Sequence, residues 1–263
     1  MTKRIAVLCL AMLALAGCQT NTSAPEKSQV ENERSEIVRE YLSADKILWT
    51  SGENVVNAQH FLNPGTGQAD LVGANLCSMS GDADNPPSVL LDFGKELHGG
   101  IEIVTGMFEG NAPISVQITL GESVTEAMSS VGASSATNDH AMRDFTISLP
   151  WLGKTEIGNS GFRFARITML DANRTLLLKE IRAISIYRDI PWVGSFTCND
   201  ERLNEIWKVG ARTVHLNMQD YLWDGIKRDR LVWVGDMHPE VMTILSVFGY
   251  NEVVPKRDRK SVV

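Results

Sequence analysis

The sequence lacks both an excess of basic charge and an apolar run that could cross a membrane. Its 263 residues carry 25 Lys and Arg against 32 Asp and Glu, so the formal net charge is -7. Because proteins bind nucleic acid through a basic face, this balance argues against nucleic acid as a partner. The apolar run at residues 5–16 has only twelve residues, whereas a helix that spans a bilayer needs roughly 20.

Signatures of metal, phosphate and serine chemistry are missing as well. The sequence shows no zinc-ligand spacing and no glycine-rich phosphate loop, and Ser123 and Ser195 lie outside any nucleophile-elbow context. We therefore predict neither a metal nor a cofactor. Cysteine is scarce, with four in the chain. Away from the N-terminus only Cys77 and Cys198 remain, and we favour two separate thiols over a disulfide, although an oxidising compartment would permit one.

The N-terminus has the pattern of a secretory signal: Lys3 and Arg4, the short apolar run and then small residues. Residues 15–18, Leu-Ala-Gly-Cys, resemble a bacterial lipobox, in which the chain is cleaved before a lipid-carrying cysteine. The resemblance implies a signal peptide at residues 1–17, lipidation of Cys18 and a membrane partner in the cell envelope. Gln19 favours the outer membrane. The alternative is an anchor helix that stays uncleaved.

Residues 18–38 are polar and are predicted to form a flexible tether. Residues 39–190 alternate between apolar and polar side chains in short runs, with Gly and Asn turns between them. Strands are expected at residues 88–93, 100–108, 114–120, 143–149, 162–170 and 176–187, and an exposed loop at 128–142. This pattern predicts an antiparallel, jelly-roll-like β-sandwich.

The apolar period changes to that of helices after Trp192. Asn199 is the expected N-cap of a first helix. A second helix is expected to begin near Asp236, with Pro239 in its first turn and Gly249 at its end. The connection between the two helices, residues 223–236, reads WDGIKRDRLVWVGD. Loops carried by rigid elements often hold binding or catalytic groups.

This connection carries the side chains that sugar chemistry uses. Carboxylates can act as acids or bases or bind hydroxyl groups, tryptophan rings can stack on a sugar, and a guanidinium can donate a fork of hydrogen bonds. The residues concerned are Asp224, Asp229, Asp236, Trp223, Trp233 and Arg228. Considered alone, however, such a run of charges is more typical of a solvated, salt-bridged loop.

Residues 224–236 resemble the active-site segment of the bacterial α-L-rhamnosidases. Residues 194–207 resemble the lead-in to that family's catalytic domain, and residues 92–97 and 161–167 resemble its accessory β-sandwich, which implies an accessory role for residues 39–190. The resemblance implies that residues 191–257 are the start of an (α/α)6 barrel, and that the activity is inverting hydrolysis of terminal α-L-rhamnose without a cofactor. It implies Asp229 as the general acid. It also implies a set of substrate-binding residues, namely Asp224, Arg228, Trp233 and Asp236.

Neighbouring charges decide whether Asp229 can serve as an acid. Arg228 and Arg230 would lower its pKa if they face it, whereas burial or a nearby Asp224 or Asp236 would raise it. The sequence leaves this choice open.

The C-terminal end carries two further expectations. Residues 258–263, DRKSVV, read like a translated sequencing adapter and are predicted to be non-native, so that the barrel is incomplete. The family's general base has no counterpart in this chain, and we expect the 263-residue product to be inactive. Two alternatives stay open: a non-catalytic lipoprotein that binds carbohydrate or a partner protein, and a related barrel hydrolase for another sugar.

Overall fold

A computed structural model of the chain describes residues 36–71, 76–133 and 142–255, which lie in a compact unit assigned to residues 35–263. The predicted signal peptide, Cys18, residues 134–141 of the predicted loop and the tail at 258–263 fall outside the described residues. Within the described part, none of the helices has the length and apolar character needed to cross a bilayer.

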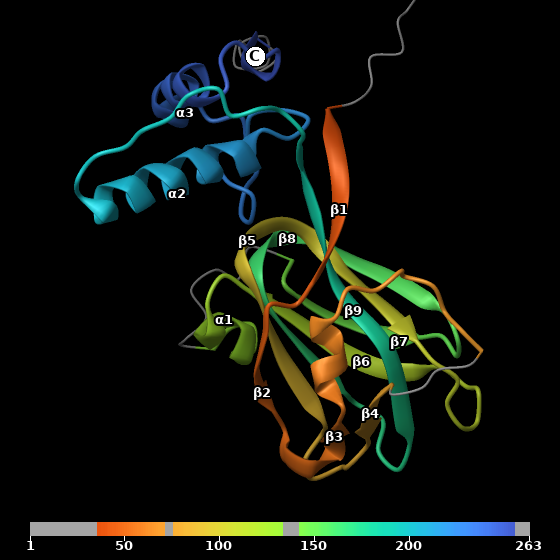
Figure 1. Ribbon diagram of the computed structural model, residues 1–263. Helices are drawn as coiled ribbons and strands as arrows, with labels where there is room; N and C mark the ends of the chain where they lie inside the picture. The colour runs from red at the N-terminus through yellow and green to blue at the C-terminus, as the bar shows by residue number, and fades with distance from the viewer. Residues whose placement is uncertain (1–35, 72–75, 134–141, 256–263) are drawn as a thin grey trace, which may run out of the picture. The chain divides into compact units, whose positions relative to one another are not determined.

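The described residues form nine strands and three α-helices (Figure 1). The strands are β1 (Ile37–Ser43), β2 (Lys46–Thr50), β3 (Val55–Val56), β4 (Cys77–Ser80), β5 (Ser88–Thr105), β6 (Ile114–Gly121), β7 (Asp144–Leu149), β8 (Lys154–Met169) and β9 (Thr175–Arg188). The helices are α1 (Val124–Met128), α2 (Glu201–Asn217) and α3 (Val234–Val247), with short 3-10 turns at Gly52–Asn54 and Ala58–Leu62. The β domain, as we call β1–β9 with α1, precedes the helical hairpin α2–α3.

All strand pairs are antiparallel, and three long strands change partners along their length. The first part of β5 pairs with β2 and β8, whereas its last part pairs with β8 and β9. A register shift separates Asp92 from Leu97, and Gly94 within it has a φ of 77°. Such a bulge bends a strand. The predicted strands at 88–93 and 100–108 are therefore one bent strand, and β8 begins earlier than predicted.

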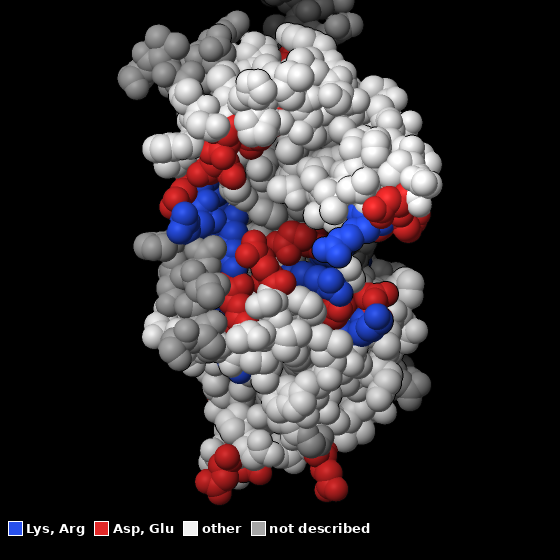
Figure 2. Space-filling view, turned by 90° about the vertical axis from the view of Figure 1, so that its left-hand side faces the viewer, with Lys and Arg blue, Asp and Glu red and all other residues white. Residues whose placement is uncertain are grey.

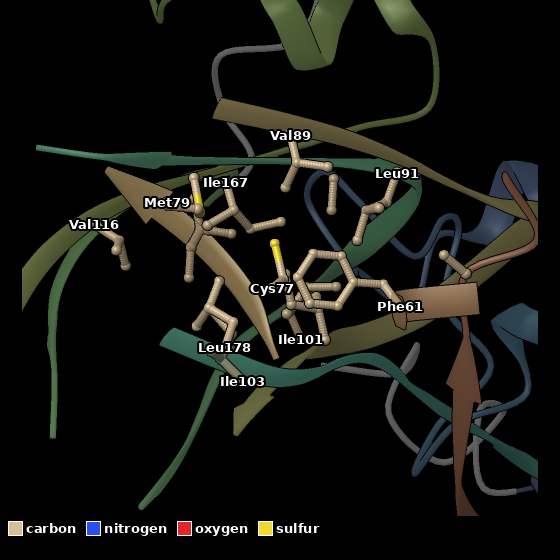
Figure 3. Close-up of a cluster of buried hydrophobic side chains, with 14 of the residues drawn as sticks. Phe61, Cys77, Met79, Val89, Leu91, Ile101, Ile103, Val116, Ile167 and Leu178 are labelled. Atoms are coloured by element: carbon tan, nitrogen blue, oxygen red, sulfur yellow. The ribbon is translucent and has the colours of Figure 1, made fainter. Parts of the chain in front are cut away.

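The hydrophobic core lies inside the folded sheet, as Figure 3 shows. Side chains from β5, β8 and β9 meet there, and those of Val89, Ile101, Ile167 and Leu178 are almost fully buried. Cys77 is also buried, so burial raises the pKa of its thiol to about 12. Cys77 and Cys198 are both free thiols, in agreement with the preference for separate cysteines. The predicted antiparallel β domain is confirmed, and β1 begins slightly before the predicted boundary at residue 39.

The helical hairpin has its own apolar cluster, which includes Val214, Leu222, Ile244 and Phe248. Its caps differ from the prediction. Asp200, rather than Asn199, is the N-cap of α2, because its carboxylate accepts hydrogen bonds from the backbone N–H groups at positions 202 and 203.

Helix α3 also begins in a different place from the one predicted. It begins at Val234 instead of near residue 236, and no side chain caps it. Pro239 consequently lies beyond the first turn, inside the helix. Gly249 follows the last turn with a φ of 77°, a conformation that suits glycine and confirms the predicted end of the helix.

Candidate functional site

The connection between α2 and α3 is a closed loop. The backbone N–H of Asp224 donates to the carbonyl of Leu231 at 2.9 Å, and the Leu231 N–H donates to Asp224 Oδ1 at 2.8 Å. Between them, Asp229 and Arg230 have φ values of 59° and 53°, so two consecutive non-glycine residues adopt the left-handed conformation. This conformation is costly for such residues and persists only where surrounding contacts enforce it. The loop is therefore held from outside.

The loop forms one wall of a cleft of about 910 Å³. The β domain supplies a second wall, through Gly94, Lys95, Glu96, Glu122 and Arg163. Helix α2 supplies a third, through residues that include Glu205, Lys208, Arg212 and Asn217. Acidic and basic side chains gather in the hollowed face of the molecule (Figure 2). The cleft thus combines hydrogen-bonding groups of both charges, which suits a polar ligand.

Three of the five predicted site residues line this cleft, namely Asp224, Arg228 and Asp229. Trp233 and Asp236 do not line it. Trp233 is the N-cap of α3 and its side chain is exposed, while Asp236 lies in the first turn of that helix. The structure thus brings together the first part of the predicted site but not the whole of it.

The two arginines beside Asp229 have different partners. Arg228 Nε lies 3.4 Å from Asp229 Oδ2, and the two side chains are 54% and 47% exposed. Arg230 instead donates to the carbonyls of Asn159 and Ile226, and its guanidinium lies 5.5 Å from the ring centroid of Trp223. Of the two flanking cations, only Arg228 forms an ion pair with Asp229 among the described residues.

Lys227 anchors the loop to the β domain. It is 6% exposed, and its ammonium donates to both carboxylate oxygens of Glu126 in α1 and to Glu122 at 3.2 Å. Glu126 is 3% exposed, and Arg143 Nε lies 3.7 Å from it. Sequence reasoning missed this anchor, since a lysine inside a run of charges gives no signal that it is buried.

An aromatic contact supports the other side of the loop. His98 in β5 is 2% exposed, has a backbone hydrogen bond to Ile226, and meets the Trp223 ring edge-on at 5.3 Å between centroids. Burial, aided by the charge of Arg230, lowers the pKa of His98 to about 4, so the imidazole is neutral near pH 7. Ile226 also packs over Gly161, where an added Cβ would lie 2.8 Å from Ile226 Cγ1. The β domain therefore shapes the loop through direct packing.

Glu96 is a second cleft residue that sequence reasoning missed. Burial, with a smaller contribution from Glu122, raises the pKa of its carboxyl group to about 8. Its backbone carbonyl accepts two hydrogen bonds from Arg212 in α2, at 3.2 and 2.5 Å. Sequence patterns show the strand but not the bulge that turns this side chain toward the cleft. Among the described residues, no group of three or more His, Cys, Asp or Glu is arranged to hold a metal ion.

The fold of the β domain and helical hairpin matches solved structures of a class of sugar-cleaving enzymes. Residues 191–260 match the family model of the bacterial α-L-rhamnosidase six-hairpin glycosidase domain. The chain is related to the bacterial α-L-rhamnosidases, and its helices correspond to the start of their hairpin domain. The resemblance predicted from the sequence is confirmed.

Solved structures show the same fold. A rhamnosidase from Klebsiella oxytoca with rhamnose bound matches with a TM-score of 0.60 at 19% identity, over 84% of this chain and 43% of that one. A GH78 family rhamnosidase of Bacillus sp. GL1 matches with a TM-score of 0.58 at 23% identity, over 72% of this chain and 19% of that one. The chain thus spans less than half the length of either structure. A search of curated proteins finds no match.

Proposed function

We propose that this chain carries part of the active site of an inverting glycoside hydrolase that removes terminal α-L-rhamnose from oligo- or polysaccharides. The observation that carries the proposal is the position of Asp224, Arg228 and Asp229 together on one cleft, within the segment that matches the rhamnosidase hairpin domain. Asp229 is proposed as the general acid, while Asp224 and Arg228 bind sugar hydroxyls. Trp233 and Asp236 are proposed to join the site from the start of α3.

Inverting hydrolysis needs two carboxyl groups. One protonates the leaving oxygen, and the other activates a water molecule from the opposite face of the sugar, roughly 6.5–9.5 Å away. The rhamnosidase resemblance gives this chain the acid but no counterpart of the base. In addition, the side chain of Asp229 is 47% exposed and forms an ion pair with Arg228, whereas the acid of a glycosidase is usually buried. We therefore expect the 263-residue chain to release no rhamnose by itself.

Hydrolysis of an aryl α-L-rhamnoside tests the proposal. The 263-residue chain should be inactive, and the proposed activity should be found in a form extended by further hairpin-domain sequence. In that form Asp229→Asn should lower kcat by about 10²-fold or more, the usual contribution of a general acid. The matched control is Asp220→Asn, an exposed carboxylate outside the cleft lining, which should leave kcat unchanged. A loss below about tenfold for Asp229→Asn would remove its assigned role.

Two alternatives to rhamnose hydrolysis stay open. Relatives under a quarter identical share the fold, and a shared fold does not fix the substrate. A related hydrolase for another deoxy or uronic sugar would use the same cleft, whereas a non-catalytic lipoprotein would bind sugar or a partner protein through its β domain. A panel of aryl glycosides separates the two enzyme candidates, and binding without turnover in the extended form identifies the third.

We further propose that the protein is attached to the cell envelope, in the outer membrane, through a lipid on Cys18. The lipobox-like residues 15–18 and the polar stretch that follows support this proposal. Metabolic labelling with a radioactive fatty acid should label the wild-type protein and not Cys18→Ala. An unlabelled wild type would refute the anchor.

A further inference from the structure

Glu96 lies in a part of β5 that leaves the regular ladder. Asp92 pairs with Phe164 and Leu97 with Phe162, so the intervening residues bulge out of the pairing with β8. Three of these residues, Gly94, Lys95 and Glu96, line the cleft. Bulges recur beside active sites because they redirect a side chain from the face of the sheet. The carboxyl group of Glu96 lies near the charges of three other cleft residues, Glu122, Lys227 and Arg212.

Contacts from both sides fix the bulge. Asp92 accepts a hydrogen bond from the backbone N–H of Gly94 at 2.8 Å. Its carboxylate also forms a bidentate salt bridge with Arg163, with hydrogen bonds of 2.7 and 2.9 Å. Across the cleft, Arg212 of α2 holds the backbone carbonyl of Glu96. The Glu96 side chain therefore projects from a backbone that is fixed by both the β domain and the helical hairpin. A preorganised support of this kind is what a ligand-binding group needs.

The carboxyl group itself has an unmet hydrogen-bonding need. Its Oε1 atom is buried and has no hydrogen-bond partner among the described residues, so a ligand hydroxyl would reach the carboxyl group through Oε2. The charged groups that face it are Glu122 and Glu126, which disfavour ionisation, and Lys227, Arg212 and Arg163, which favour it. Burial outweighs the cations, so the pKa is raised to about 8. Near pH 7 the group is a neutral acid that can both donate and accept, as a sugar hydroxyl can.

We propose that Glu96 is a sugar-binding residue that the β domain contributes to the cleft, where its carboxyl group hydrogen-bonds a hydroxyl of the rhamnose unit. This inference rests on the proposed function, because it assigns a residue to the same sugar site. It makes the β domain a part of that site rather than an appendage. Ionisation of the carboxyl group removes its donor, so rhamnose affinity should fall as the pH rises through about 8.

An NMR titration of the 15N-labelled chain with L-rhamnose tests the inference. At a pH well below 8, Glu96→Ala should bind roughly fivefold more weakly than the wild type, the effect of one lost hydrogen bond. Glu96→Gln, which mimics the neutral acid, should bind within about twofold of the wild type. Above pH 8 the wild type should weaken while Glu96→Gln does not. The matched control is Glu109→Gln, an exposed carboxylate outside the cleft lining, which should behave as the wild type does.

The outcomes separate this inference from the proposed function. If Asp224→Ala loses rhamnose binding while Glu96→Ala binds as the wild type does, the role of Glu96 is wrong and the sugar site stands. The role is also wrong if Glu96→Gln keeps the pH dependence of the wild type. If the wild-type chain binds no L-rhamnose, the role of Glu96 is wrong, whereas the proposed function is judged separately by hydrolysis in the extended form. The amide spectrum of each variant shows whether it has folded, and Glu96→Gln keeps the test decisive if Glu96→Ala has not.

Discussion

The ammonium of Lys227 donates hydrogen bonds to both carboxylate oxygens of Glu126, and both residues are more than nine-tenths buried. One comes from the loop between α2 and α3 and the other from α1 of the β domain, far apart in the sequence. The ion pair therefore joins the segment that carries Asp224 and Asp229 to the β domain.

Replacing Lys227 by Met should destabilise the protein by about 3 kcal/mol, because the Glu126 carboxylate would remain buried without its closest partner. Breaking a buried ion pair usually costs about 3–5 kcal/mol. We expect the lower end of this range, since Arg143 stays 3.7 Å from that carboxylate. Urea unfolding measures the loss. The double variant Lys227→Met/Glu126→Gln should lose less than the sum of the single variants, which shows the coupling between the two residues.

Lys208 provides the control for this variant. It forms a similar pair with Glu205 at 2.7 Å, but both side chains are more than half exposed. Exposed pairs contribute little, so Lys208→Met should leave the unfolding midpoint almost unchanged. Equal effects of the two methionine variants would show that the buried pair does not hold the loop.

Ionisation of Glu96 should make the protein less stable at alkaline pH. Its carboxyl pKa is raised from 4.5 in the unfolded chain to about 8 in the folded one, so the folded state binds more protons between these values. The stability contributed by the neutral acid is full below about 4.5 and is lost as the pH rises through about 8. Urea unfolding across this window should show a steeper decline for the wild type than for Glu96→Gln. Equal slopes would contradict the raised pKa.

His98 should act in the opposite direction. Its pKa falls from 6.5 to about 4 on folding. Between these pH values the imidazole is therefore protonated in the unfolded chain but neutral in the folded one. Its contribution to stability is full above 6.5 and is lost as the pH falls toward 4. His98→Phe keeps an aromatic ring against Trp223 but does not titrate. As the pH falls from 6.5 to about 4, the melting temperature of the variant should therefore fall less than that of the wild type. Identical pH profiles would refute the lowered pKa of His98.

Two glycine variants should change stability with opposite signs. An added Cβ at Gly161 would lie 2.8 Å from Ile226 Cγ1 and 3.1 Å from Lys227 Cβ, so Gly161→Ala should destabilise by about 1–3 kcal/mol. At Gly210, an exposed position inside α2, the same atom meets nothing within 4 Å. Gly210→Ala should therefore stabilise by roughly 0.5–1 kcal/mol. Chemical denaturation compares the two, and a neutral Gly161→Ala would show that the loop does not pack tightly there.

The sequence predicts the elements of this fold better than it predicts their ends or their contacts. Alternating residues identify β6, and the helical period identifies α2, because each element buries one face. The bend of β5 at Gly94 depends on pairing with distant strands, and local patterns therefore show two strands where there is one. The predicted N-cap of α2 is one residue away from the observed one, because Asn199 and Asp200 are adjacent and either side chain can cap a helix.

For the candidate site, a resemblance located Asp224, Arg228 and Asp229, which the structure places on one cleft. No local signal could reveal Glu96 or Lys227 as their neighbours. Their burial arises from contacts between residues about a hundred positions apart, as in the Lys227–Glu126 pair. The roles of all five residues stay predictions, and Trp233 and Asp236 do not line the cleft.

The most direct test of the account is to map L-rhamnose binding onto the chain by amide chemical shifts in NMR. We expect saturable shifts on both walls of the cleft, at residues 224–229 of the loop and at residues 94–96 of β5. Galactose at the same concentration serves as the control sugar and should cause smaller shifts. Shifts confined to other surfaces, or none at all, would contradict the claim that loop and bulge together form a rhamnose site.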